Sequence, residues 1–181
     1  MTTATATPVA TGTWTADPVH SNAEFAVKHM VVATFRGSFA EIDATLDLAS
    51  DTPTLRGSVP VASIVVKDEN LKGHLLSPDF FDAENAPNIS FASDAVERGA
   101  GNDVTVRGSL TVKNATHPVV LTGSLSEPIE HFAGGERIAL DLTTAIDRTV
   151  YGLDWNAPLP KGGFALGNDV TLSVHLELQN A

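Results

Sequence analysis

Apolar and polar residues alternate over much of this chain, which is the pattern of β-strands that bury one face. In residues 103–113 the even positions hold only Val, Gly and Leu, whereas the odd positions hold Asp, Thr, Arg, Ser and Lys. The same one-sided pattern returns in residues 119–125, 138–146 and 170–178. Because successive side chains on a strand point to opposite faces, these stretches predict long strands with one apolar face. The turns between them favour an antiparallel barrel or sandwich.

The phase of this alternation shifts inside residues 34–48. Apolar residues occupy odd positions up to Phe39 and even positions from Ile42 onward. We therefore expect one long strand with a bulge or bend near Ala40, since such irregularities let a strand curl around a closed sheet. The shift favours a strongly twisted barrel over a sandwich.

Residues 65–91 are the one region that carries helix signals. Asp68 is a good N-cap, and Leu71 and Leu75 fall four apart on one helical face, so residues 68–76 are predicted to form a short amphipathic helix.

The pair Ser77-Pro78 then repeats the start signal of a helix, which predicts a second helical turn carrying Phe80 and Phe81. These two side chains are expected to anchor the insert, near residues 68–82, in the core. A helical insert between long strands is expected to plug or cover one mouth of the barrel.

Four glycines raise the question of whether the barrel is hollow. Gly37, Gly57, Gly108 and Gly123 all lie on the inward phase of their strands, where a packed core usually has a large side chain. One interpretation is an apolar lumen that holds an extended chain. The other is that these glycines only relieve bends in a twisted sheet, with Phe and Leu from other strands filling the space.

Length and composition indicate one globular domain, residues 12–181, after a Thr- and Ala-rich N-terminal stretch, residues 1–11, expected to be a disordered tail. The net charge of −11 argues against binding nucleic acid or anionic lipid surfaces through the overall field, although it leaves a local basic pocket open. The absence of cysteine excludes thiol catalysis, disulfides and thiolate metal sites.

The N-terminal stretch has no basic region followed by an apolar run, and no part of the chain approaches the length of a membrane span. We therefore expect a cytoplasmic protein without a transmembrane segment. A periplasmic or secreted location is expected only if a signal peptide has been removed.

A set of short motifs then suggests a family. It comprises Trp14, Asp17, His20-Ser21, Phe25, Val27, His29, Phe35, Gly37, Phe39, His74-Leu75, the run SPDFFD from Ser77 to Asp82, Pro87, Ile89, Phe91, Gly108 to Thr111, Asp147-Arg148 and Tyr151 to Leu153. In order and spacing the set resembles the YceI-like family, bacterial lipocalin-like proteins that bind polyisoprenoid lipids. The resemblance covers nearly all of the chain from Thr13 to Leu178.

The resemblance implies an extended antiparallel barrel of about eight strands, similar in shape to a lipocalin, with a long isoprenoid tail in its lumen. Dimers are common in the family, so a homodimer is expected. One departure concerns the helix: many members have Arg-Asp and one further residue before the His-Leu pair, whereas this chain has Leu71-Lys72-Gly73 before His74-Leu75. This puts any polar contact that the family makes through that Arg in doubt here.

Candidate chemistry is sparse. The six histidines show no HxH or HExxH spacing, so we expect no metal and interpret His20, His29 and His74 as hydrogen-bonded structural residues; His175 should face solvent. No GxSxG, P-loop or dinucleotide motif is present, and no cofactor is expected.

The pair Asp147-Arg148 has two interpretations. Beside Tyr151, the arginine could bind a phosphate or quinone oxygen, or it could form a salt bridge to Asp154 or Glu177 that fastens the last loop.

These observations predict an all-β, extended antiparallel lipocalin-like barrel that binds, sequesters or transports an isoprenoid or similar long-chain lipid, without catalysis. The predicted lining residues are Phe25, Val27, Phe35, Phe39, Phe91, Leu110, Leu140 and Leu142, and the predicted polar contacts are His74, Arg148 and Tyr151. Two alternatives stay open: an enzyme acting on a hydrophobic substrate in the same cavity, and a stress-related interaction protein with a filled core.

Overall fold

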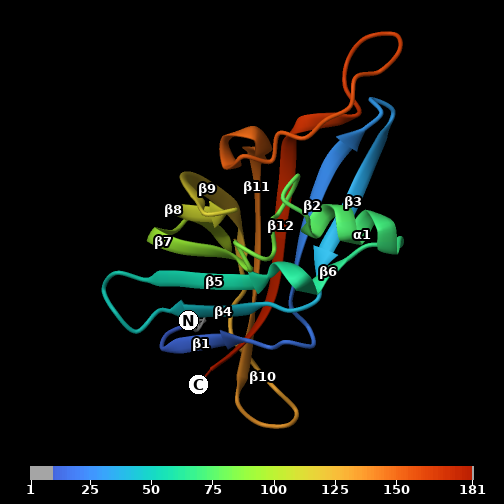
Figure 1. The fold of residues 1–181 in the computed structure, drawn as a ribbon. Coiled ribbons are helices and arrows are strands. Elements are labelled where there is room, and N and C mark those ends of the chain that lie inside the picture. Colours follow the sequence, from blue (N-terminus) through green and yellow to red (C-terminus); the bar gives the residue numbers. More distant parts are fainter. Residues whose placement is uncertain (1–9, 181) are drawn as a thin grey trace, which may run out of the picture.

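The structure is a computed structural model that describes residues 10–180, and its fold is one continuous antiparallel sheet wrapped into a barrel (Figure 1). The strands are β1 (Thr13–Ala16), β2 (Asn22–His29), β3 (Ala33–Phe39), β4 (Asp43–Asp47), β5 (Thr54–Pro60), β6 (Ile64–Val65), β7 (Asn88–Arg98), β8 (Asp103–Val112), β9 (Ala115–Leu125), β10 (Ile129–Glu130), β11 (Glu136–Asp147) and β12 (Leu166–Asn180). The helix α1 (Glu69–Leu76) and two 3₁₀ turns, η1 (Val61–Ser63) and η2 (Arg148–Tyr151), complete the described elements.

Eight strands close into a ring in the order β11-β9-β8-β7-β5-β4-β1-β12, and pairing of β11 with β12 completes it. This confirms the predicted all-β barrel. β2, β3 and β6 extend the sheet from the other edge of β12, and β10 pairs only with β11. We call the end with β10 and the two ends of the described chain the lower end, and the opposite end the upper end (Figure 1).

The longest strand, β12, connects the two ends because its partners change along its length. β1 pairs with Leu178–Asn180 at the lower end, whereas β2 pairs with Val170–His175 further up. Between β1 and β2 the chain turns around Glu177, whose carbonyl accepts hydrogen bonds from the Asp17 amide (2.8 Å) and the Ser21 hydroxyl (3.2 Å). β1 and β2 therefore share one edge of β12, one at each end of the barrel.

The prediction of a single bent strand over residues 34–48 is wrong. The chain forms two strands there: β3 pairs with β2 and β6, whereas β4 pairs with β1 and β5. Residues 40–42 form the corner between them, and the Ala40 amide donates to the Ser63 carbonyl (2.9 Å). The shift in apolar phase therefore marks a change of partner strands rather than a bulge within one strand.

The short helix is present as predicted. α1 spans Glu69–Leu76, and the Asp68 side chain accepts a hydrogen bond from the Leu71 amide (2.8 Å), which is the expected N-cap. Where a second helical turn was predicted, the chain forms a hydrogen-bonded turn in which the Phe80 amide donates to the Ser77 carbonyl (3.0 Å). Phe80 and Phe81 are both buried, so the turn still anchors the insert.

The interior divides into two clusters of buried apolar side chains. The lower core, which fills the ring near β1 and β4, contains Trp14, Ala44, Leu46, Leu55, Val104, Val106, Leu121, Leu125, Ile138, Leu140, Leu142, Leu176 and Leu178. The upper core, beneath α1 and η2, contains Phe25, Val27, Phe39, Val59, Val61, Ile64, Leu75, Phe80, Phe81, Leu110, Val112, Tyr151, Leu153 and Val170.

The N-terminal boundary differs slightly from the expected one. Ala10 is buried in the lower core, and its carbonyl accepts a hydrogen bond from Arg98 (3.4 Å). Residues 10 and 11 therefore pack with the barrel, and the rest of the predicted tail, residues 1–9, lies outside the described residues.

Candidate functional site

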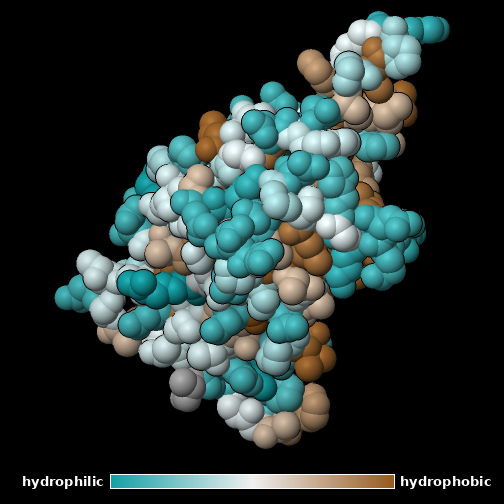
Figure 2. All heavy atoms as spheres, viewed as in Figure 1, coloured by the Kyte–Doolittle hydropathy of each residue, from teal (hydrophilic) through white to brown (hydrophobic). Residues whose placement is uncertain are grey.

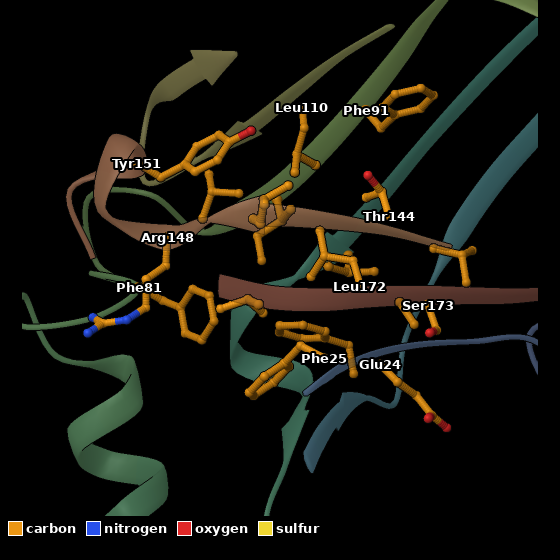
Figure 3. A pocket seen from close by; sticks show the side chains of 18 of the residues that line it. Glu24, Phe25, Phe81, Phe91, Leu110, Thr144, Arg148, Tyr151, Leu172 and Ser173 are labelled. Carbon is orange, nitrogen blue, oxygen red and sulfur yellow. The ribbon is translucent and has the colours of Figure 1, made fainter. Parts of the chain in front are cut away.

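A cavity of about 450 Å³ lies between the upper core and the top of the lower core. Its walls are almost entirely apolar and come from every side of the barrel: α1, the turn after it and strands β2, β3, β7, β8, β11 and β12 all contribute. Figure 3 shows Phe25, Phe81, Leu110 and Leu172 approaching it from four different elements. This volume lies in the range of natural ligand pockets.

Aromatic rings make one wall of the cavity. Phe25 lies with its ring centroid 6.1 Å from Phe35, 6.0 Å from Phe39 and 6.2 Å from Phe81. Phe39 and Phe81 meet edge to face at 5.9 Å. Three of these rings come from β2 and β3, and the fourth comes from the turn after α1. The helical insert thus closes the wall by adding one ring to a cluster that the strands provide.

A second group of rings joins α1 to the segment after η2. The His74 ring packs edge to face against Phe80 (4.9 Å) and Trp155 (4.8 Å), and Phe80 lies 5.4 Å from Trp155. His74 is oriented by Asp79, whose Oδ2 lies 3.0 Å from its Nε2. All three rings line the cavity, so His74 acts here as part of the wall.

Arg148 is the only buried charged side chain among the described residues. Its Nε donates to the Gly167 carbonyl (2.8 Å), and its Nη1 donates to the carbonyls of Trp155 (3.0 Å) and Leu153. Within residues 10–180 its Nη2 has no hydrogen-bond partner. Burial lowers the pKa of the guanidinium from its usual value, yet an arginine keeps its charge in proteins.

The predicted salt bridge from Arg148 to Asp154 or Glu177 does not form among the described residues; Arg148 fastens the last loop through backbone carbonyls instead. Glu177 lies near Arg137, with 3.6 Å between Oε1 and Nε.

Tyr151 packs beside this arginine at the end of η2. It is buried, its ring lies 4.9 Å from that of His117, and burial raises the pKa of its hydroxyl. The His117 Nε2 lies 3.0 Å from the Val150 carbonyl oxygen. β9 and β11 pair through Thr122–Leu125 and Leu140–Thr143. Above this point they diverge, and a second, more open pocket lies between them, lined by residues 117–120 and 144–147 and by Val150 and Tyr151.

Ten of the eleven residues predicted as ligand contacts line the cavity. They are Phe25, Val27, Phe35, Phe39, His74, Phe91, Leu110, Leu142, Arg148 and Tyr151. Leu140 does not line it. Leu140 lies opposite Leu125 and Leu176 in the lower core. The alternation along its strand predicts which face a residue occupies, but not how far along the barrel it lies. Contact of any of these residues with a ligand stays a prediction.

The glycines do not make the cavity, with one exception. A Cβ on Gly108 would meet the Ala92 carbonyl oxygen, and a Cβ on Gly123 would meet that of Asp141, so these glycines let neighbouring strands approach closely. A Cβ on Gly37 would lie 2.5 Å from the Phe25 ring. Only Gly57 lines the cavity. The interpretation in which glycines serve the twisted sheet is therefore the right one for the other three.

Several wall residues were missing from the prediction. Trp155, Leu153, Leu166, Val170 and Leu172 all line the cavity. Leu172 lies on the apolar face of its strand, in phase with the predicted contacts. Trp155 follows the Tyr151–Leu153 motif in an irregular segment, where no periodicity indicates which way a side chain points.

A cluster of potential metal ligands lies outside the cavity. Donor atoms of Asp17, His20 and Glu177 lie within 4.8 Å of one another. His20 Nδ1 is 3.4 Å from Asp17 Oδ2 and 3.9 Å from Glu177 Oε1, and the latter atom also faces Arg137. The cation of Arg137 already neutralises Glu177, so ion pairing accounts for this arrangement. His175 is exposed, as predicted, and pairs with Asp141 (2.7 Å).

Comparison with known proteins identifies the family. The family model of the YceI-like domain matches residues 14–178. The chain belongs to the YceI-like family. A UPF0312 protein of Staphylococcus aureus (strain USA300) is 31% identical over 168 residues, which cover 91% of this chain and 95% of that protein.

Solved structures share the YceI-like fold. The crystal structure of Burkholderia cenocepacia BcnA matches with a TM-score of 0.76 at 22% identity, covering 92% of this chain and 99% of that one. A polyisoprenoid binding domain from Saccharophagus degradans matches with a TM-score of 0.68 at 11% identity, covering 93% and 98%. At these identities the likeness shows the fold alone. No helix in residues 10–180 is long and apolar enough to cross a membrane.

Proposed function

We propose that this YceI-like protein binds an isoprenoid chain of the polyprenyl or quinone type in its upper cavity, and sequesters or carries it. The observation that carries the proposal is the cavity itself: about 450 Å³ enclosed by aromatic and aliphatic side chains within the upper half of the barrel. Membership of the YceI-like family and the likeness in fold to a polyisoprenoid binding domain support the same ligand class.

Binding would come mainly from removal of apolar surface from water. Each CH₂ group buried in such a cavity contributes about 0.8 kcal/mol, so a branched hydrocarbon chain needs few polar contacts to bind well. Several wall residues, among them Phe35, Ile89 and Leu172, point inward and yet remain partly exposed. Their residual surface faces the cavity, and a ligand would cover it.

The polar end of the ligand is expected beside Arg148. Arg148 lines the cavity, but its buried guanidinium points away from the other labelled lining residues (Figure 3), and one of its nitrogens has no partner in the described structure. A buried charged donor is stabilised by an anionic or carbonyl acceptor. A phosphate or quinone oxygen that reached this buried nitrogen would complete its hydrogen bonding, with the hydrocarbon chain extending along the ring cluster of Phe25, Phe39 and Phe81.

The cavity also weighs against the filled-core alternative, in which the barrel interior holds only side chains. Replacing Gly108 by Leu does not separate the two interpretations, since a side chain there would clash with the Ala92 backbone whether or not a ligand binds.

Native mass spectrometry of the freshly purified protein tests the proposal. We expect a bound species of defined mass, released by organic extraction and identified as an isoprenoid. An unliganded mass that does not change after incubation with polyprenyl phosphates and isoprenoid quinones would contradict the proposed function.

A further inference from the structure

The upper tip of the molecule is built from two segments that lie side by side. One is the β2–β3 hairpin with its flanks, residues 28–36, and the other is residues 155–168, which run from the loop after η2 into the start of β12. The Met30 amide donates to the Ala165 carbonyl (2.6 Å), and Leu166 pairs with His29. Figure 1 shows both loops projecting together beyond the body of the barrel. We call these two segments the upper tip.

The upper tip exposes large apolar side chains. Val32 is 85% exposed, Val31 69%, Phe164 59% and Met30 44%. Figure 2 shows brown and tan spheres at the projecting end of the molecule, among white and teal ones. A contiguous exposed apolar surface on a globular protein usually marks an interaction site.

The charges of the upper tip are of one sign. Neither segment contains Asp or Glu, and together they carry Lys28, Arg36 and Lys161, in a chain whose net charge is −11. All three cations are exposed, and none forms an ion pair within the part of the chain that the structure describes. Asp154 and Asp169 directly flank the second segment, so the positive charge is confined to the upper tip itself, beside the exposed apolar side chains.

The loop at the lower end also exposes large apolar side chains, but it does not combine them with positive charge. Phe132 there is 97% exposed and Ile129 is 67% exposed. Their neighbours in sequence, however, include the acidic residues Glu127, Glu130 and Glu136, against one cation, Arg137. The two ends of the barrel thus present similar apolar side chains in opposite electrostatic settings.

The upper tip is also held in a defined shape. Asn156 donates from its side-chain amide to the Leu166 carbonyl (2.8 Å) and accepts from the Leu166 amide (2.9 Å), which closes the loop between them. Met30 and Val31 have φ angles of 52° and 66°. A β-branched residue such as Val31 is strained in this region, so the hairpin presents its apolar side chains at a cost in backbone energy.

We propose that the upper tip docks on an anionic lipid surface, with Val31, Val32 and Phe164 entering the headgroup boundary and the cations contacting lipid phosphates. Exposed apolar side chains together with lysines and arginines are the combination that binds such surfaces. A second copy of this chain docked tip to tip would bring the same three positive charges to the contact and be repelled. An anionic membrane complements both the charge and the apolar surface.

This inference concerns the outside of the molecule and goes beyond the proposed function, but the two are connected in space. His29, Phe35 and Leu166 belong to the upper tip and also line the cavity. A protein docked in this orientation would hold its cavity next to the membrane, where isoprenoid lipids reside.

Co-sedimentation with vesicles of phosphatidylglycerol and phosphatidylcholine tests the docking. We expect binding that weakens with added salt and with pure phosphatidylcholine vesicles. Lys28→Gln and Lys161→Gln should each weaken it about five-fold. The triple variant Val31→Ser, Val32→Ser, Phe164→Ser should weaken it by more than about ten-fold.

The double variant Ile129→Ser, Phe132→Ser is the matched control, because it removes exposed apolar side chains from the acidic lower end and should leave vesicle binding unchanged. Thermal melts of all variants verify that they fold. Equal binding by the upper-tip and lower-end variants, or no binding of the unaltered protein to the anionic vesicles, would overturn the proposal. A dimer in sedimentation velocity that the triple variant loses would overturn it in favour of self-association.

The docking and the proposed function can fail separately. Isoprenoid uptake from detergent, measured without vesicles, should be unchanged in the upper-tip variants. If the unaltered protein bound the vesicles but took up no isoprenoid, only the proposed function would be contradicted.

Discussion

The lower and upper halves of this barrel share strands and alternation but differ in how their interiors are filled. In the lower core Trp14, Leu46, Leu140 and Leu178 have almost no exposed surface. In the upper half, inward-facing residues such as Leu172 keep part of their surface open to a cavity of about 450 Å³. The same strands, β11 and β12, run through both halves, so the hollow interior does not come from a different strand pattern.

The difference comes from what closes each half. At the lower end eight strands form a continuous hydrogen-bonded ring, and their side chains meet in the centre. At the upper end β9 and β11 diverge, and β2, β3, α1 and η2 join β7, β8 and β12 in forming the walls. A wider perimeter built from separate elements leaves space at the centre. Thus the lower half is expected to determine stability, and the upper half is expected to determine binding.

Truncating one leucine in each half should show the largest difference. Leu140→Ala removes a fully packed side chain and should lower the free energy of unfolding by about 2–5 kcal/mol, without weakening isoprenoid binding. Leu172→Ala enlarges an existing cavity, so it should cost less stability and weaken binding instead. Denaturant unfolding and ligand titration of both variants measure this. Equal stability losses would mean that the upper half is packed as tightly as the lower.

Two leucines on the same face of β12, Leu178 in the lower core and Leu172 at the cavity, can be enlarged instead of truncated. Leu178→Phe overfills the lower core and should cost about 1–3 kcal/mol of stability. Leu172→Phe extends into empty space, so its stability loss should stay below about 1 kcal/mol. It should weaken ligand binding roughly ten-fold, which is about the affinity that burial of two CH₂ groups of a ligand contributes. A Leu172→Phe variant that unfolds as easily as Leu178→Phe would contradict the hollow upper half.

Alternation in the sequence was enough to predict which face of each strand points inward, and the Asp68 cap was enough to predict α1. The position of an inward-facing residue along the barrel axis was not predictable, because the alternation of a strand is the same along its whole length. Leu140 and Leu142 share one face of β11, yet only Leu142 reaches the cavity.

Other features depended on contacts between distant segments. The break between β3 and β4 follows from different partner strands, and the role of Gly123 follows from close approach to Asp141 on a neighbouring strand. The position of Trp155 depends on Arg148, which binds its carbonyl. None of these contacts leaves a periodic signal in the sequence. The charge pattern of the upper tip is visible in the sequence, but only the fold brings its two segments together.

Arg148 offers a smaller test within the upper half. Geranylgeranyl phosphate should bind more tightly than geranylgeraniol, because its charged oxygens accept a stronger hydrogen bond from the unpartnered Nη2 than a hydroxyl oxygen does. Arg148→Gln should remove most of this preference, about ten-fold, while the affinity for the alcohol changes less. Arg148→Lys, which keeps the charge, is the matched control and should retain part of the preference. An unchanged preference in Arg148→Gln would place the head group elsewhere.

Lowering the pH should slightly reduce the stability of both halves. Hydrogen bonds from the Thr149 hydroxyl and amide lower the pKa of Asp147 at the upper end, and amide donors led by Val19 lower the pKa of Asp17 at the lower end. Because the folded-state pKa of each lies below the unfolded value of 3.8, their contribution is present above that pH and is lost as the pH falls below it. Asp147→Asn and Asp17→Asn should each make the melting temperature less dependent on acid. A melting temperature that falls with pH as much as that of the unaltered protein would contradict this assignment.

The chain's two tryptophans allow the central claim to be tested in one experiment, since Trp14 lies in the lower core and Trp155 lines the cavity. Tryptophan emission is followed while geranylgeraniol, which does not absorb in this range, is added. We expect a saturable shift to shorter wavelength in the unaltered protein and none in Trp155→Phe, in which only Trp14 reports. An unchanged emission of the unaltered protein at saturating ligand, or a shift that persists in Trp155→Phe, would contradict a ligand-binding upper half above a packed lower one.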